Sequence, residues 1–246
     1  MSSAGQLSAL VGQSIRDAAR TGTYRSAVFL PMLFFLCFYT PLRDTVPDDG
    51  YATYVLPLVA VQAAIFVAIS AAGMAAEVSA AGMGQRLRSL PMPAWLPVAA
   101  RATVSMTVTF TSMCAAVLVA VIFGFRPKFE HVGKLALAVV LVVALGVALS
   151  MLSDALGTRV ARVDSVQQAM IVPQILLVML STGLVPESAF PEWVQGFVRN
   201  QPVSVLSDAL RELISGRDGG GAAWAWVAVL FVAGAACATF ASRRRS

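Results

Sequence analysis

Six long runs of uncharged, mostly apolar residues divide the chain, and each run is bounded by charged residues, Pro or Gly. A helix of about 20 apolar residues is long enough to cross the hydrocarbon core of a bilayer. Glycine and proline inside such runs are tolerated, because neighbouring helices and polar side chains satisfy the backbone groups that they free. The pattern predicts an all-α polytopic membrane protein with six transmembrane helices, at about residues 26–42, 51–76, 98–124, 134–153, 166–184 and 222–241.

The residues before the first run follow a different pattern. Apolar residues recur at helical spacing from Leu7 to Ala19, whereas Arg16 and Asp17 lie elsewhere around the helical wheel. This predicts a cytoplasmic, amphipathic interfacial helix over residues 1–25, followed by a six-helix transmembrane domain over residues 26–246. A plain soluble lead-in helix is the alternative.

The loop before the last run, residues 185–221, is long enough to contain structure of its own. Val194, Phe197 and Val198 share one helical face, and a second apolar face runs from Val205 to Leu213. Prolines and a glycine punctuate the two stretches. We expect two short amphipathic helices at the outer membrane interface.

Composition supports the membrane assignment. Hydrophobic residues make up 58% of the chain and charged residues only 13%, against roughly 25% charged residues in average soluble domains. Nucleic acid is therefore not an expected partner. The three cysteines all lie inside apolar runs and there is a single histidine, so neither a disulfide framework nor a Cys/His metal site is expected.

The distribution of basic residues predicts the sidedness of the chain. With both termini inside, 11 of the 18 Lys and Arg residues lie in inner segments and 7 in outer ones. Positive charge concentrates on the cytoplasmic side of membrane proteins. The outer group of Arg126, Lys128 and Lys134 runs against the trend. The majority favours a multi-pass protein with both termini in the cytoplasm.

Motifs for chemistry within the chain are missing. A P-loop requires G-x-x-x-x-G-K-[ST], and neither Lys128 nor Lys134 has that context. Paired carboxylates or an activated nucleophile at bilayer depth are also missing from the six runs. The chain is therefore not expected to be an enzyme, and any ATP that drives its work must bind to another chain.

Uncharged polar residues inside the runs are the candidates for a substrate path. An amide facing lipid is costly, so each glutamine is expected to face protein or a cavity. Hydroxyl groups in a span can also serve helix packing, and for the threonines we favour packing over a role in the substrate path. The candidate path residues are Gln62, Gln167, Gln168, Gln174, Thr103 and Thr107. A mostly apolar path with a few amides and hydroxyls suits a large hydrophobic substrate better than an ion or a sugar.

Two segments carry a family resemblance. GQRLRSLPMP, residues 84–93, resembles the cytoplasmic loop between the second and third spans of ABC-2 type transporter permeases. STGLVPESAFPEWVQGFVRNQPVSVLSDALRELISG, residues 181–216, resembles the outer loop of the same permeases. Together they resemble the daunorubicin-resistance type of permease subunit. One departure is Ala94-Trp95, where a basic residue is expected in many relatives.

The resemblance implies roles for individual residues. Coupling to an ATPase would fall to Glu77, Arg86, Leu87, Arg88, Ser89, Leu90 and Pro91. The outer-loop motif consists of Pro191, Trp193, Asn200, Pro202 and Arg211. For Arg86 and Arg88 the alternative is that they only enforce topology. The resemblance also implies that the second and fifth spans, which carry the four glutamines, line the seam between two permeases.

The implied function is that of a membrane-spanning permease subunit in an ATP-driven ABC exporter of the bacterial cytoplasmic membrane. Its cargo would be hydrophobic or amphipathic: anthracycline-like drugs, or complex envelope lipids such as phthiocerol dimycocerosate. Expected partners are two copies of an ABC ATP-binding subunit, which hold ATP and Mg²⁺, a second six-span permease that is a sister subunit or another copy of this chain, and membrane lipids. The alternatives are a secondary carrier or channel acting without an ATPase, and a membrane anchor without transport activity.

Overall fold

A computed structural model describes residues 3–20, 22–43, 50–80, 95–127, 129–157 and 163–243. All regular elements in these ranges are helical. They are α1 (Ser3–Arg20), α2 (Thr23–Leu42), α3 (Tyr51–Ala80), α5 (Trp95–Ile122), η1 (Phe129–His131), α6 (Val132–Gly157), α7 (Val163–Met179), η2 (Glu187–Ala189), α8 (Glu192–Asn200), α9 (Pro202–Ile214) and α10 (Gly221–Arg243).

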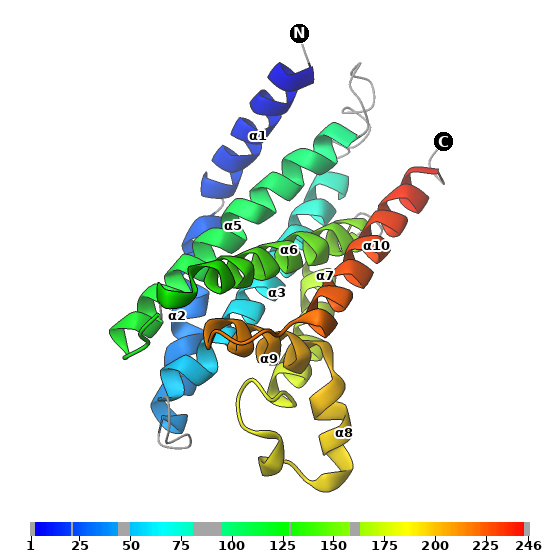
Figure 1. The fold of residues 1–246 in the computed structure, drawn as a ribbon. Coiled ribbons are helices and arrows are strands. Elements are labelled where there is room, and N and C mark those ends of the chain that lie inside the picture. Colours follow the sequence, from blue (N-terminus) through cyan, green and yellow to red (C-terminus); the bar gives the residue numbers. More distant parts are fainter. Residues whose placement is uncertain are drawn as a thin grey trace.

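The long helices run back and forth between two ends of a bundle (Figure 1). Both chain termini lie at one end, which we call the terminal end. Helices α8 and α9 lie at the opposite end, which we call the cap end. Because α2 and α3 meet at the cap end, α3 runs from the cap end towards the terminal end, and α5 runs back again.

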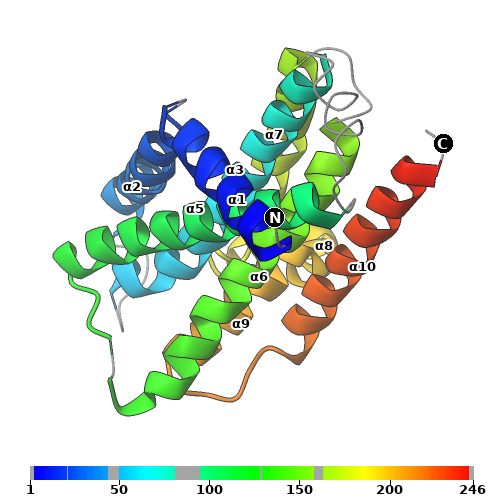
Figure 2. The same cartoon turned by 90° about the horizontal axis from the view of Figure 1, so that it is seen from above.

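Helix α3 forms the centre of the bundle. It packs against α2, α5, α6, α7 and α9, and Figure 2 shows it surrounded by its neighbours. In its most apolar stretch 78% of the residues are buried, against 17% in that of α2. A helix that is apolar all round belongs in the interior of a bundle. Helix α3 is therefore the core helix of the bundle.

Helices α5 and α6 are antiparallel and held in register by two contacts. Arg101 Nε on α5 lies 2.7 Å from Asp154 Oδ2 on α6 near the terminal end. Two turns closer to the cap end, a Cβ atom added to Gly146 would clash with the Thr109 side chain, so only glycine fits there. Close approach through small residues is typical of membrane helix pairs.

The predicted all-α polytopic membrane architecture is confirmed. Four described helices are long and apolar enough to span a bilayer, namely α2, α3, α5 and α6, and shorter apolar stretches cover Gln168–Met179 and Gly221–Cys237. The expected short helices before the last span are present as α8 and α9. The count of six spans stays a prediction.

Most helix ends lie within a few residues of the predicted spans, and the largest difference is at the end of α7. Helix α7 ends at Met179 rather than at residue 184, and residues 180–184 form turns against α3. Gly183 packs so closely on Leu58 that a Cβ atom would lie 2.7 Å from Leu58 Cδ1. At the terminal end, the predicted N-terminal helix is present as α1, and it packs against α5 and α2 with Ala18 fully buried.

Candidate functional site

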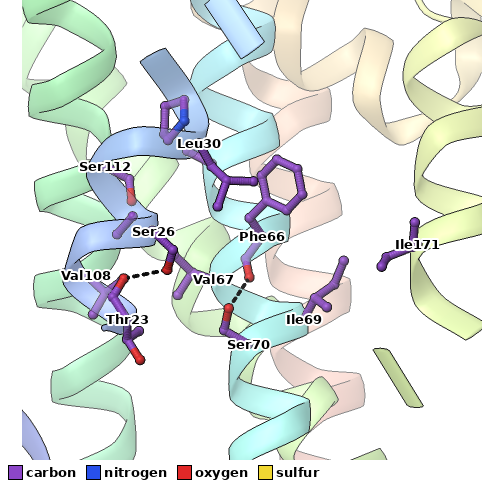
Figure 3. Close-up of a pocket in the computed structure, with 13 residues that line it drawn as sticks. Thr23, Ser26, Leu30, Phe66, Val67, Ile69, Ser70, Val108, Ser112 and Ile171 are labelled. Carbon is purple, nitrogen blue, oxygen red and sulfur yellow. Dashed lines mark hydrogen bonds between the residues drawn. The ribbon is translucent and has the colours of Figure 1, made fainter. Parts of the chain in front are cut away.

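A pocket of about 160 Å³ lies between α2, α3 and α5, with one side chain of α7 at its edge (Figure 3). Its lining residues are Thr23, Ser26, Ala27, Leu30, Pro31, Ala63, Phe66, Val67, Ile69, Ser70, Val108, Ser112 and Ile171. Small residues from α2 and α3 leave this space, because Ala27 and Ala63 fill much less volume than leucine would. In Figure 3, Ile171 lies apart from the other labelled side chains, beyond Ile69.

The pocket walls are apolar with a few hydroxyl groups. All of the lining residues are uncharged. Ser26 Oγ donates to Thr23 O over 2.9 Å, and Ser70 Oγ donates to Phe66 O over 3.0 Å. Such back-bonds satisfy the hydroxyl protons and leave the oxygen lone pairs able to accept. The pocket is therefore suited to an apolar molecule that carries a few polar groups.

Pro31 leaves one carbonyl group of α2 beside the pocket without its helical donor. Proline has no backbone N–H, so within α2 it cannot donate to the carbonyl oxygen of Ala27, four residues earlier. Ala27 and Pro31 both line the pocket. The carbonyl group of Ala27 lacks its usual helical donor and is able to accept a bond from a ligand or from water.

Gln62 lies directly beyond the pocket on the same face of α3. It precedes Phe66 by four residues, which is one helical turn towards the cap end. Gln62 is buried, and its Oε1 atom has no hydrogen-bond partner among the described residues. Buried polar atoms in native proteins are normally paired with protein or water. Gln62 thus has an unpaired carbonyl oxygen one turn beyond the pocket, and its role in a substrate path stays a prediction.

The remaining candidate path residues lie outside the pocket lining. Gln174 is buried with its Oε1 atom unpaired in the described structure, and Gln168 is exposed on α7. The side chain of Gln167 is outside the described part of the chain. Thr103 Oγ1 donates to Ala99 O over 2.9 Å, and Thr107 Oγ1 lies 2.8 Å from Tyr24 Oη. Both threonines thus make the packing contacts expected of hydroxyls in spans, and a role in the path stays a prediction.

The motif residues of the outer loop lie at the cap end. Pro191 caps α8, Pro202 begins α9, and the Asn200 side chain donates to Gly196 O over 2.8 Å. Trp193 is exposed on α8. Prolines at these positions suit helix starts, because proline needs no intrahelical donor bond there. Four of the five motif residues therefore shape or flank the two short helices.

Arg211, the fifth motif residue, points into the bundle. Its guanidinium carbon lies 4.0 Å from the centre of the Tyr54 ring on α3. The guanidinium group also bonds Asp208 one turn earlier on α9 and donates to Tyr54 O over 3.3 Å. A cation above an aromatic ring is attracted by the ring quadrupole. Arg211 therefore connects α9 to the cap end of α3.

Sequence reasoning missed several residues of both sites. The pocket residues Ser26, Pro31 and Ser70 and the Arg211 partners Tyr54 and Asp208 were not predicted. Serine and proline within otherwise apolar spans were a usable signal for the pocket. The partners of Arg211 had no comparable signal, because they come from segments far apart in the sequence.

Of the candidate coupling residues, only Glu77 belongs to the described part of the chain. Glu77 is exposed near the end of α3. Arg86, Leu87, Arg88, Ser89, Leu90 and Pro91 lie outside the described residues. Helix α5 begins at Trp95, after this segment in the sequence. The assignment of the segment to coupling stays a prediction.

Comparison with known proteins identifies the class. A sequence profile of the family described as ABC-2 family transporter protein matches residues 38–243. The chain belongs to this ABC-2 family. It is accordingly an integral membrane protein and a permease subunit of an ABC transporter, which implies an ABC ATPase subunit as partner. Permease subunits are not catalytic themselves, in agreement with the missing P-loop.

The relatives that it matches are named for drug resistance. The chain is 30% identical to the doxorubicin resistance ABC transporter permease protein DrrB of Mycobacterium tuberculosis, over 78% of this chain and 70% of the relative. It is 29% identical to the probable doxorubicin resistance permease DrrC of the same organism, over 79% and 71%. It is 28% identical to the daunorubicin resistance permease DrrB1 of Streptomyces coeruleorubidus, over 78% and 68%. The expected kinship with daunorubicin-resistance permeases is confirmed.

Proposed function

We propose that this chain is the membrane half of an ATP-driven exporter of hydrophobic or amphipathic molecules, with anthracycline-like drugs or complex envelope lipids as its cargo. The single observation that supports this most strongly is the uncharged pocket between α2, α3 and α5. Its apolar walls favour hydrophobic molecules, and its hydroxyl and carbonyl oxygens accept bonds from polar substituents. The names of the relatives, which mention doxorubicin and daunorubicin resistance, support a drug as cargo.

The pocket holds only part of such a cargo. A volume of about 160 Å³ lies below the range of roughly 300–1,000 Å³ that is typical of complete small-molecule sites. A second permease, either a sister subunit or another copy of this chain, would complete the site. Helices α2 and α7 present exposed apolar residues near the pocket, such as Phe29, Leu33, Val172 and Leu176, and these face lipid or that second permease.

Energy for export would come from the partner ATPase, in two copies, with ATP and Mg²⁺ bound there and no cofactor in this chain. The segment 84–93 and Glu77 would dock on that ATPase. ATP binding would favour one of two conformations of the permease, because a ligand shifts an equilibrium only by its differential affinity for the two states. In this scheme the terminal end of the bundle is cytoplasmic and the cap end lies outside.

Orientation is tested by labelling single cysteines in a background without Cys37, Cys114 and Cys237. In intact cells we expect a cysteine at Ser188, an exposed residue of the cap end, to react with an impermeant thiol reagent. A cysteine at Ser3 should react only after the cells are permeabilised, because basic residues favour cytoplasmic termini. The opposite labelling pattern would reverse the assignment of sides.

The cargo site is tested by filling the pocket. Ser70→Phe places a large side chain where Ser70 now bonds Phe66 O, and we expect doxorubicin efflux to fall roughly tenfold, the effect of about 1.4 kcal/mol of lost binding free energy. Val229→Phe is the matched control, because Val229 is exposed on α10, away from the pocket. Efflux from cells that also express the ATPase is the measurement. Equal efflux by the two variants at equal membrane levels would exclude this pocket.

A further inference from the structure

One face of α3 leads from the pocket to the cap end. Tyr51, Tyr54, Leu58, Gln62, Phe66 and Ile69 follow one another at spacings of three or four residues. Residues at such spacings lie above one another on a single helical face. Phe66 and Ile69 line the pocket, and Gln62 lies between the pocket and the cap. A molecule that moves along this face from the pocket would therefore meet Tyr51 and Tyr54 last.

The end of α7 closes over that last stretch of α3. Tyr54 Oη donates to Thr182 O over 2.6 Å, and Tyr51 Oη donates to Leu184 O over 3.2 Å. Thr182 and Leu184 belong to the turns that follow Met179, the last residue of α7. The final carbonyl groups of a helix have no intrahelical donors. Here Tyr51 and Tyr54 of α3 donate to carbonyl groups just beyond the helix end, and thereby tie the turns after α7 to α3.

Helix α9 lies across the same turns, and the residues at its start form hydrogen bonds with them. Gln201 Nε2, just before α9, donates to Leu177 O over 2.8 Å and also to Leu180 O. Ser204 Oγ accepts a bond from the backbone N–H of Thr182 over 3.1 Å. Thr182 Oγ1 in turn donates to Asp208 Oδ2 over 2.9 Å. The first two turns of α9 are thus bonded to the residues that close the end of α7.

Arg211 joins these parts. Its guanidinium group pairs with Asp208, lies over the Tyr54 ring, and donates to both Tyr54 O and Thr182 O, the latter over 3.4 Å. One side chain therefore contacts α3, the turn after α7, and α9 itself. Arginine suits this role because its planar guanidinium carries five donors and also stacks on aromatic rings.

We propose that α9 is the outer gate of the path along α3, and that Arg211 is the positioning residue that holds this gate closed. The outer gate consists of Tyr51, Tyr54, the turns at residues 180–184, and α9. This inference rests on the proposed function, because it supposes a cargo that leaves by the cap end.

The ion pair between Asp208 and Arg211 lies where water can reach both side chains. The side chain of Asp208 is 42% exposed and that of Arg211 is 22% exposed. Ion pairs with access to water contribute little net stability, because water replaces the partner when they separate. Opening the gate would hydrate both charged groups and would leave neither buried alone. Lys134 donates to Gly216 O over 2.7 Å, two residues after the end of α9, and so ties that end of the helix to α6.

The test measures access to the path from outside. In the cysteine-free background, Gln62→Cys places a thiol beneath the gate, and an impermeant thiol reagent is applied to intact cells. With Arg211 present we expect slow labelling. With Arg211→Ala we expect labelling to accelerate about tenfold or more, because the guanidinium bonds to Tyr54 O and Thr182 O are lost along with the exposed pair with Asp208, and bonds to a charged group shift such an equilibrium by about that factor. Arg211→Lys, which keeps the charge beside Asp208 and Tyr54, should restore part of the protection.

The matched control is Arg199→Ala on α8. Arg199 is exposed and lies 4.0 Å from Glu187, so its removal changes the cap surface without touching the gate. Equal labelling rates for Arg199→Ala and Arg211→Ala would overturn the proposal. If Arg211→Ala fails to reach the membrane, Tyr54→Phe removes only the bond to Thr182 O and must still accelerate labelling. Labelling needs neither cargo nor ATP, so failure of export leaves this result interpretable.

Discussion

Replacing Arg86 and Arg88 together by glutamate is expected to abolish export and to weaken binding of the ATPase roughly 30-fold or more. These arginines lie in the short segment between α3 and α5, followed by Pro91 and Pro93, which suits one or two helical turns. Together with Leu87 and Leu90, they would present to the ATPase an apolar contact surrounded by positive charge. Removal of a close interfacial charge pair commonly costs about 2–5 kcal/mol, and reversal adds repulsion. Co-purification with the ATPase and drug efflux are the two measurements.

The control for this experiment is charge reversal elsewhere on the same side of the membrane. Arg243, Arg244 and Arg245 at the C-terminus are interpreted as a topology signal only. Their replacement by glutamate should leave ATPase binding largely intact wherever the chain still inserts. If the Arg86→Glu, Arg88→Glu variant binds its ATPase and exports normally, the assignment of residues 84–93 to coupling is wrong.

Replacement of Arg101 by alanine is expected to cause the largest loss of stability. Arg101 Nε donates to Asp154 Oδ2 over 2.7 Å, and the Asp154 side chain is only 15% exposed. Breaking a buried ion pair by removing one partner commonly costs about 3–5 kcal/mol, because a buried charge remains uncompensated. The pair is partly open to solvent on the Arg101 side, at 42% exposure, so we expect about 3 kcal/mol. Thermal unfolding of the purified chain in detergent measures the loss.

A neutral double variant separates lost charge pairing from lost packing. Arg101→Met with Asp154→Leu removes both charges and keeps apolar volume, and such pairs often recover the stability of a buried ion pair. We therefore expect a midpoint of unfolding well above that of Arg101→Ala. A double variant as unstable as Arg101→Ala would show that charge compensation does not set the energy of this contact.

The helices of this protein were predictable because their hydrophobic pattern reflects a single local requirement. In a bilayer every backbone group must be bonded internally, so each long apolar run becomes a helix. The end of α7 was the exception. Residues 180–184 are uncharged and therefore fall within the predicted span, yet they form turns after Met179. Bonds from Tyr51, Tyr54 and Gln201 stabilise that turn, and these residues are distant in the sequence.

The two sites differ in how much of them the sequence revealed. Arg211 was identified through a motif, but its partners Tyr54 and Thr182 depend on how α9 lies against α3. Gln62 was predicted from the cost of placing an amide in a span, and the structure places it one turn beyond the pocket. The pocket itself depends on the spacing of α2, α3 and α5 around Ala27 and Ala63. Helix spacing is a property of the packed bundle, which no local pattern encodes.

Transport by purified components tests the central proposal most directly. The chain is purified in mild detergent with the ATPase that accompanies it, reconstituted into vesicles, and assayed for doxorubicin movement with and without ATP. We predict that a protein carrying a Walker A motif co-purifies and that movement requires both this protein and hydrolysable ATP. Movement driven by the chain alone, without the ATPase, would contradict the proposal and would identify a secondary carrier or channel.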